Sequence, residues 1–342
     1  MIMEPESDDN IPEKIRQIEI QARKVVNSLF SGEYHSIFKG MGLMFAESRP
    51  YQPGDDIRAM DWKVTARSDE PFIKIFHEER ELTLTLLVDL SGSGRFGSGG
   101  KFKNEAAANL CAALAFSAIR NNDKVGLIAF TDRVELYIAP KKGRTHVLRL
   151  IRELLYFKPE GKGTDIACAL EFTGRVITKK SIAFLVSDFK DKGYDKAMAT
   201  IAKKHDFIAV RIFDPLEEAL PNVGYVALED AETGQRAVVN TSDPAIRKKY
   251  AEQASSANLK RSRFFAKAGV DEVVVEAGGS YIEPLVKFLS SGKAGGVSDE
   301  IIPDLGPCLI PRPAALPCRE PGDIPRRIRD SLPHYRQDHR PR

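Results

Sequence analysis

One run of the sequence, from Leu82 to Leu90, places the tightest constraint on the fold. It ends in the apolar residues Leu86, Leu87 and Val88, as expected for a β-strand that is covered on both faces. After it, strand-like and helix-like segments alternate as far as residue 289. Such alternation is typical of α/β domains. We therefore expect a mostly parallel, Rossmann-like sheet with helices on both faces.

The chain divides into three parts by pattern and composition. Residues 1–81 are expected to form an N-terminal helix, at 11–30, and a small charged lobe. Residues 82–292 are expected to form the sheet domain. Residues 293–342 are rich in proline and arginine and poor in aromatic residues, so this segment cannot bury enough apolar surface to fold alone. We expect it to be a disordered tail.

The secondary structure of the first two parts is predicted from periodicity and turn residues. Residues 40–56 are expected to be an irregular loop with short extended pieces. The expected strands are 72–76, 82–90, 125–130, 134–139, 182–186, 207–213 and 272–276, with a hairpin at 225–239. The expected helices are 104–121, 146–156, 165–177, 195–204, 244–267 and 282–289.

Charge and hydropathy exclude several classes of protein. The 51 basic and 48 acidic residues nearly cancel, which argues against a protein built to coat nucleic acid. No stretch reaches the ~18 consecutive apolar residues of a membrane span. The first ten residues are acidic and polar, the reverse of a secretory signal. We therefore expect a cytoplasmic protein.

Oxygen-bearing side chains follow the most apolar strand, in the pattern Asp89-x-Ser91-x-Ser93. In an open α/β sheet, ligands bind at the carboxyl ends of the strands. Two later loops add Thr164, ahead of a predicted helix, and Asp188, after the strand 182–186. Carboxylate and hydroxyl oxygens are hard ligands that suit Mg²⁺ or Mn²⁺.

Structural roles compete with this interpretation. Ser91 or Thr164 could cap the following helix, and Asp165 could take that role in place of Thr164. Asp89 could simply end its strand in a turn. The occurrence of all three loops in the right order, each after its expected element, favours the metal site.

Other chemistries fail at defined positions. Neither Gly100-Lys101 nor Gly161-Lys162 completes the GxxxxGK[ST] pattern of a phosphate-binding loop. Ser91 stands where a haloacid dehalogenase would need its second aspartate. The chain has no GxSxG elbow around its serines at 91 and 93 and no HExxH pair for zinc.

The five residues Asp89, Ser91, Ser93, Thr164 and Asp188 together resemble the metal-ion-dependent adhesion site of the von Willebrand A family. The resemblance implies a von Willebrand A-type sheet. It also implies that the three hydroxyls coordinate one Mg²⁺ or Mn²⁺, with the two aspartates bound directly or through water. An open coordination position would then accept a carboxylate from a partner protein.

A second signature lies upstream, between Gly42 and Arg67. Every fixed position of the block GxxFxExRxYxxGDDxRxxDWxxxAR is filled there. The block resembles a bacterial family catalogued as a domain of unknown function and associated with MoxR-type AAA+ ATPases. Gly94 replaces the methionine that often follows DxSxS in that family. Many members also carry membrane spans, which are not found in this sequence.

The upstream block also allows structural expectations. Trp62 is the only tryptophan of the chain, and we expect it to be largely buried where the lobe packs against the sheet domain. Because a buried arginine without a carboxylate is costly, we expect Arg49, Arg58 or Arg67 to pair with acidic neighbours.

Three functions fit the sequence. The first is a non-enzymatic, metal-dependent protein-interaction module, which implies a MoxR-type ATPase as partner and a chaperone-like maturation system that acts on client proteins. The alternative is a metal-assisted phosphohydrolase using Asp89, for which Asp165 would be the only spare carboxylate and Lys162 the only nearby cation. The third is a purely structural α/β protein.

Overall fold

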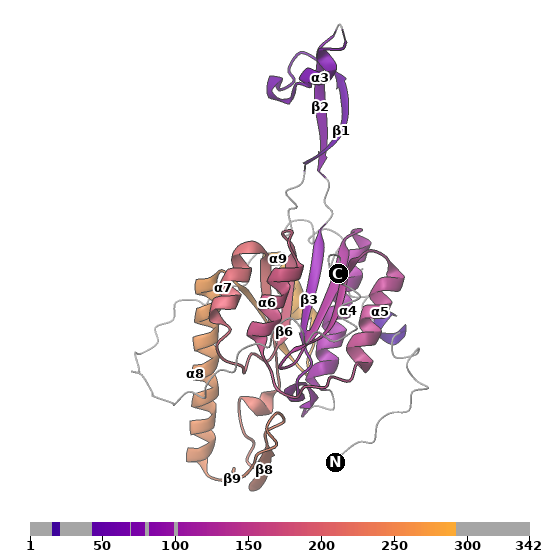
Figure 1. The fold of residues 1–342 in the computed structure, drawn as a ribbon. Helices are drawn as coiled ribbons and strands as arrows, with labels where there is room; N and C mark the ends of the chain where they lie inside the picture. Colours follow the sequence, from indigo (N-terminus) through magenta and orange to yellow (C-terminus); the bar gives the residue numbers. More distant parts are fainter. Residues whose placement is uncertain (1–15, 21–42, 69, 79–81, 99–101, 292–342) are drawn as a thin grey trace, which may run out of the picture.

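A six-stranded sheet forms the centre of the protein (Figure 1). The computed structural model of the chain describes residues 16–20, 43–68, 70–78, 82–98 and 102–291. The strands of this sheet are β3 (Thr83–Asp89), β4 (Lys124–Phe130), β5 (Val134–Lys141), β6 (Ile182–Ser187), β7 (Asp206–Phe213) and β10 (Asp271–Glu276). Only β5 is antiparallel to its neighbour. The predicted fold class, α/β with a mostly parallel sheet, is confirmed.

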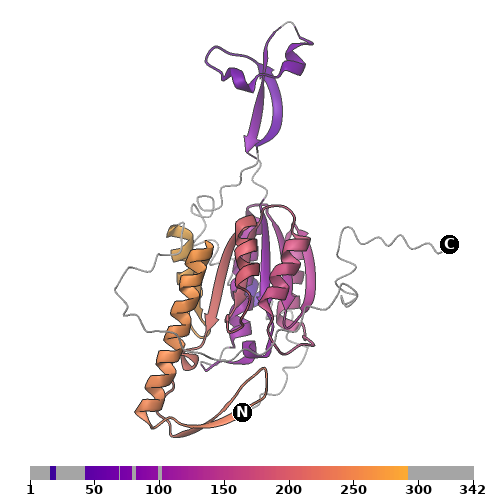
Figure 2. The same cartoon turned by 60° about the vertical axis from the view of Figure 1, so that its left-hand side comes forward.

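Helices cover both faces of the sheet (Figure 2). Alternate residues of β3 point to opposite faces, so that Leu84 and Leu86 lie in one core and Leu87 in the other. The first core is closed by α4 (Lys103–Arg120), α5 (Arg144–Tyr156) and α9 (Ile282–Ser291). The second is closed by α6 (Ile166–Val176), α7 (Asp195–Lys204) and α8 (Pro244–Ala268).

The strand order creates a binding position at one place along the sheet. The order is β10-β7-β6-β3-β4-β5, so the chain first builds outward from β3 to β4 and β5 and then returns to the other side of β3. The strand order therefore reverses between β3 and β6. Loops that leave the carboxyl ends of two such strands diverge and leave a crevice between them.

The N-terminal lobe contains a two-stranded antiparallel sheet. It pairs β1 (Leu43–Pro50) with β2 (Phe72–Glu78) and adds a short helix, α3 (Trp62–Thr65). The sequence predicts an irregular loop with short extended pieces over 40–56, but residues 43–50 form one continuous strand. Pro50, Pro53 and Gly54 lie at or beyond the end of β1, next to or in the turn that follows it, and so do not interrupt the strand.

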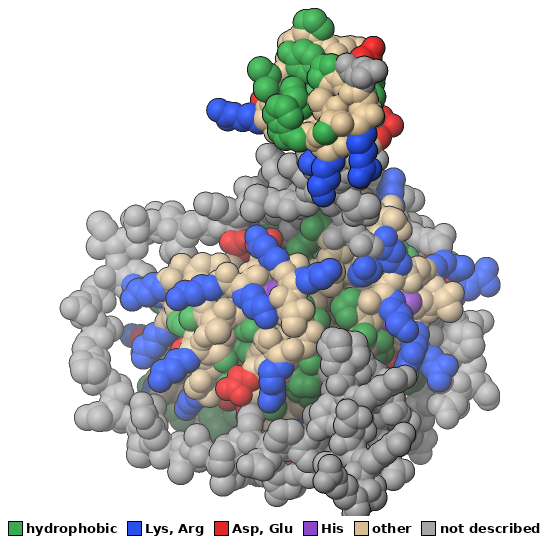
Figure 3. Space-filling model, turned by 45° about the horizontal axis from the view of Figure 1, so that its top comes forward, with side chains coloured by type: hydrophobic (Ala, Val, Ile, Leu, Met, Phe, Trp, Pro, Cys, Tyr) green, Lys and Arg blue, Asp and Glu red, His purple; other side chains and the backbone are tan. Residues whose placement is uncertain are grey.

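The predicted burial of Trp62 is wrong, because its side chain is 67% exposed. Figure 1 shows the lobe as a separate body that projects from the sheet domain, and two strands offer no second layer to cover an indole. Figure 3 shows hydrophobic side chains on the surface of this lobe. Ile57 of the lobe is also largely exposed. The ion-pair prediction is confirmed for Arg49, which makes two hydrogen bonds of 2.7 and 2.9 Å to Asp55.

Several predictions concern residues that are described only in part. Residues 16–20 are helical, within the predicted helix at 11–30. The rest of that helix and the predicted tail at 293–342 lie outside the described residues. Across the ranges that are described, no helix combines the length and the apolar character needed to cross a membrane.

Candidate metal centre

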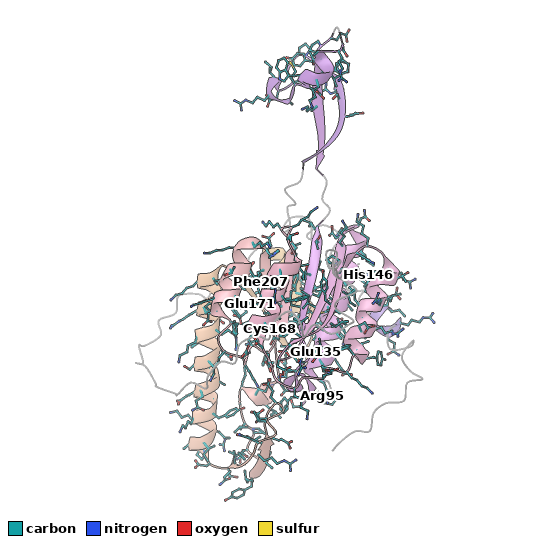
Figure 4. The ribbon with its side chains drawn as sticks, viewed as in Figure 1. Arg95, Glu135, His146, Cys168, Glu171 and Phe207 are labelled. Atoms are coloured by element: carbon teal, nitrogen blue, oxygen red, sulfur yellow. The ribbon has the colours of Figure 1, made fainter. Side chains whose placement is uncertain are left out.

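The Asp89-x-Ser91-x-Ser93 segment starts at the last residue of β3 and turns sharply. The Ser91 amide donates a hydrogen bond of 2.9 Å to Asp89 Oδ1, and the Ser91 and Ser93 hydroxyl oxygens lie 3.1 Å apart. A short 3-10 helix, Gly92–Arg95, follows. In Figure 4 the labelled Arg95 and Glu135 mark this end of the sheet. The carboxylate and both hydroxyls therefore gather at the carboxyl end of the central strand.

Asp188 reaches the same position from the neighbouring strand. It follows β6 directly, and the preceding Ser187 hydroxyl donates a hydrogen bond of 2.7 Å to Asp89 Oδ2. The Ser93 hydroxyl is hydrogen-bonded to Asp188. Asp89, Ser93 and Asp188 line one cavity of about 20 Å³, together with Lys103. A volume of this size holds about one water molecule or one small ion.

Thr164 lies in the adjacent loop and does not line this cavity. Its loop is joined to the first one by a hydrogen bond of 2.9 Å from the Gly92 amide to the Lys162 carbonyl. The Thr164 hydroxyl donates a hydrogen bond of 2.7 Å to Glu232 Oε1. Asp165 caps α6 by accepting a hydrogen bond from the Cys168 amide at 2.8 Å, so Thr164 is not the cap.

The capping role is excluded for Ser91 as well. Ser91 precedes the 3-10 helix, but its side chain makes no capping hydrogen bond there. Neither the Ser91 hydroxyl nor the Thr164 hydroxyl therefore caps a helix. Their assignment as metal ligands stays a prediction.

A buried lysine, which the sequence analysis missed, stands beside the predicted ligands. Lys103 Nζ lies 2.8 Å from Asp188 Oδ2 and 2.8 Å from Glu217 Oε1, and its side chain is only 3% exposed. Glu217 also binds the more exposed Lys190 at 2.7 Å. A cation in the first turn of a helix opposes the helix dipole, and this anomaly was the available sequence signal for Lys103.

The charges at the site are unevenly compensated. Burial and the nearby Asp188 carboxylate raise the pKa of Asp89 to about 6. Burial also acts to raise the pKa of Asp188, but the Lys103 ammonium outweighs it and holds that pKa below its usual value. Lys103 therefore pairs with Asp188, whereas Asp89 has hydrogen bonds but no ion pair with any of the described residues.

This arrangement fits a hard divalent cation. Within the described part of the chain, no three or more histidine, cysteine, aspartate or glutamate side chains gather as a metal cluster, so an ion here would depend on hydroxyl ligands. Asp89, Ser91, Ser93 and Asp188 offer oxygens only, which suits Mg²⁺ or Mn²⁺. The positive charge would also relieve the repulsion between the two aspartates.

The raised pKa of Asp89 predicts that Asp89→Asn stabilises the metal-free protein at neutral pH. The carboxyl ionises near 3.8 when unfolded and at about 6 when folded, so the folded state binds its proton more tightly. Stability is therefore lost as the pH rises from about 4 to about 6. We expect Asp89→Asn to gain about 2–3 kcal/mol at pH 7 and almost nothing near pH 4.

Urea denaturation in EDTA at both pH values measures this difference. The asparagine oxygen can accept the hydrogen bond from the Ser91 amide, and its NH2 group can donate to the Ser187 hydroxyl oxygen, so the variant can keep two local hydrogen bonds. If Asp89→Asn and the wild type unfold at the same urea concentration at pH 7, the burial of an uncompensated charge at Asp89 is refuted.

Comparisons with known proteins identify the sequence family of the chain. A family model described as "Protein of unknown function DUF58" matches residues 47–260. The uncharacterized protein Mb1516 of Mycobacterium bovis is 28% identical over 296 residues, which cover 85% of this chain and 92% of that protein. The uncharacterized protein YeaD of Bacillus subtilis is 29% identical over 109 residues, 32% of this chain and 25% of that one.

Solved structures with a similar arrangement have low sequence identity. An aerotolerance-related membrane protein from Bacteroides fragilis is 16% identical with a TM-score of 0.40, and the match covers 62% of this chain and 98% of that one. The von Willebrand A domain of SpRpn10 is 11% identical with a TM-score of 0.35, over 64% and 100% of the two chains.

Proposed function

This chain belongs to the DUF58 family of proteins of unknown function. We propose that it binds one divalent metal ion at the carboxyl edge of the sheet and uses the ion to hold a partner protein. One observation carries the proposal. Asp89 and Ser93 from the β3 loop and Asp188 from the β6 loop line a single ion-sized cavity where the strand order reverses.

The five predicted ligands comprise two charged and three neutral side chains. Asp89 and Asp188 supply negative charge, and Ser91, Ser93 and Thr164 supply neutral hydroxyl oxygens. When bound, Mg²⁺ or Mn²⁺ would act as a Lewis acid that accepts one further oxygen ligand. A carboxylate of the partner would bridge to the ion, so that the interaction is lost when the ion is removed.

We propose a MoxR-type AAA+ ATPase as the partner, in a chaperone-like system that matures client proteins. This assignment rests on the upstream block between Gly42 and Arg67. The exposed Trp62 in that block offers the ATPase a second contact, because exposed tryptophans are enriched among residues that dominate protein interfaces.

The phosphohydrolase alternative has weaker support. Asp89 is 9% exposed and both of its carboxylate oxygens accept hydrogen bonds, from the Ser91 amide and the Ser187 hydroxyl. A carboxylate held in this way is poorly placed to attack a phosphate. Asp165, which was the spare carboxylate in that scheme, is engaged as the cap of α6.

Binding of the purified MoxR-type ATPase from the same organism tests the proposal. We expect the wild type to bind in Mg²⁺ and Asp89→Asn to bind at least about tenfold more weakly in the same buffer, because loss of the ion removes the bridge. Because Mg²⁺ is present throughout, the ATPase keeps its bound nucleotide. Any difference in affinity between the variant and the wild type then comes from the Asp89 site.

Asp195→Asn is the matched control, since Asp195 is an exposed aspartate in the first turn of α7 and should bind like the wild type. If Asp89→Asn and the wild type bind the ATPase with equal affinity, the metal is not part of the interface. The interface would then lie on the block that contains Trp62. Mg²⁺-dependent hydrolysis of p-nitrophenyl phosphate that Asp89→Asn abolishes would favour the enzyme.

A further inference from the structure

The hairpin formed by β8 (Tyr225–Glu229) and β9 (Arg236–Asn240) has two unlike ends. Its arms extend beneath the sheet domain (Figure 2), and Tyr225 and Val238 on them are 77% and 73% exposed. Its turn, by contrast, reaches the predicted metal centre. The arms contribute little to the core, whereas the turn contacts the Asp89–Ser93 loop.

That contact is close and specific. A Cβ atom added at Gly92, in the Asp89–Ser93 loop, would lie 2.5 Å from the Ala231 carbonyl oxygen, so only glycine fits beneath the turn. Next to Ala231, the Glu232 carboxylate accepts the hydrogen bond of 2.7 Å from the Thr164 hydroxyl. The turn thus places one carboxylate against a hydroxyl of the predicted ligand set.

The turn is built to hold this carboxylate in position. Asp230 Oδ1 accepts hydrogen bonds from the amides of Glu232 and Thr233 at 2.9 and 3.1 Å. The Gly234 amide donates to the Asp230 carbonyl at 2.8 Å, and Gly234 has a φ of +71°, which favours glycine. Glu232 is half-buried, and its hydrogen bond to Thr164 holds its carboxylate against the loop that carries this predicted ligand.

We propose that Glu232 is a further ligand of the metal ion, supplied by the chain itself at the coordination position that a partner's carboxylate would use. This inference rests on the proposed metal-dependent function. A partner must then displace Glu232, and with it the turn of the hairpin, before its own carboxylate reaches the ion. The turn of the hairpin would then cover the site, while the arms remain exposed to solvent.

Mn²⁺ binding to the purified full-length protein tests the inference. Electron paramagnetic resonance measures free Mn²⁺ and hence the affinity, and water-proton relaxation measures the waters on the bound ion. We expect Glu232→Gln to bind Mn²⁺ about tenfold more weakly and to carry about one more exchangeable water. Glutamine can still accept the Thr164 hydrogen bond, so the turn stays in place.

Added acetate provides a second test of the coordination position proposed for Glu232. It should displace the additional water, and so lower the relaxation, in Glu232→Gln but not in the wild type. Glu229→Gln is the control, because Glu229 lies on the same hairpin, is exposed and, within the described residues, forms its ion pair with Arg236 at 2.9 Å. It should match the wild type throughout.

The outcomes separate this inference from the proposed function. If Asp89→Asn loses Mn²⁺ while Glu232→Gln keeps the affinity and the water number of the wild type, the role of Glu232 is refuted and the metal site stands. If Asp89→Asn binds Mn²⁺ as tightly as the wild type, the proposed metal site itself fails, and the inference fails with it.

Discussion

Lys103→Met should lower the free energy of unfolding of the metal-free protein by about 3–5 kcal/mol, which is the usual cost of removing one partner from a buried ion pair. Lys103 Nζ lies 2.8 Å from both Asp188 and Glu217, whose side chains are 5% and 12% exposed. Methionine fills a similar volume but leaves both carboxylates without this counter-ion. Urea denaturation in EDTA measures the loss.

The same substitution should tighten the binding of Mg²⁺, because it removes a positive charge beside the predicted ligand Asp188. Metal should then restore more stability to Lys103→Met than to the wild type. Lys190→Met is the matched control. Lys190 also binds Glu217, at 2.7 Å, but is 55% exposed, so its loss should cost less than about 1 kcal/mol.

Two results would contradict this account of Lys103. A Lys103→Met protein as stable as the wild type would show that the ammonium does not hold the site together. Weaker binding of Mg²⁺ by the variant would show that Lys103 supports the metal site and does not compete with the ion.

Asp89→Asn should weaken the binding of Mg²⁺ by about 100-fold or more, equivalent to about 2.8 kcal/mol. Ser91 and Ser93 contribute neutral oxygens, and two hydroxyls cannot offset the charge of a divalent ion. Isothermal titration with Mg²⁺ measures the loss, with Asp195→Asn as the control. The variant should also be more stable than the wild type without metal, so a general failure to fold would not reproduce its behaviour.

An unchanged affinity for Mg²⁺ in Asp89→Asn would mean that the ion binds elsewhere or that Asp89 is not a ligand. The titration of Asp195→Asn distinguishes a specific effect from a change in net charge, because both variants lose one negative charge at the same edge of the sheet.

The core of the fold could be predicted from the sequence because its signals are local. The apolar run that became β3 and the alternation after it depend on residues close together in the chain, and the described strands and helices of the sheet domain lie near the predicted ranges. The strand β1 was missed because Pro50 and Pro53 suggested a loop. The large apolar side chain of Trp62 favoured a buried position. The sequence does not show that the lobe is too thin to cover it.

The candidate site was predictable to the extent that topology alone determines it. Asp89, Ser93 and Asp188 meet because their strands are neighbours in a parallel sheet, which the motif order implied. Lys103 and Glu232 could not be placed in this way. Their roles depend on which way a helix and a hairpin fold back over the edge of the sheet, and residue spacing carries no information about that.

Anomalous diffraction from crystals of the wild-type protein soaked in Mn²⁺ tests the central claim most directly. The scattering of manganese locates the ion without assumptions about its ligands. We predict one strong peak at the carboxyl end of the sheet, between the β3 loop with Asp89, Ser91 and Ser93 and the β6 loop with Asp188, and no peak at that position in Asp89→Asn. Fully soaked crystals with a peak elsewhere, or with none, would contradict the proposed metal centre.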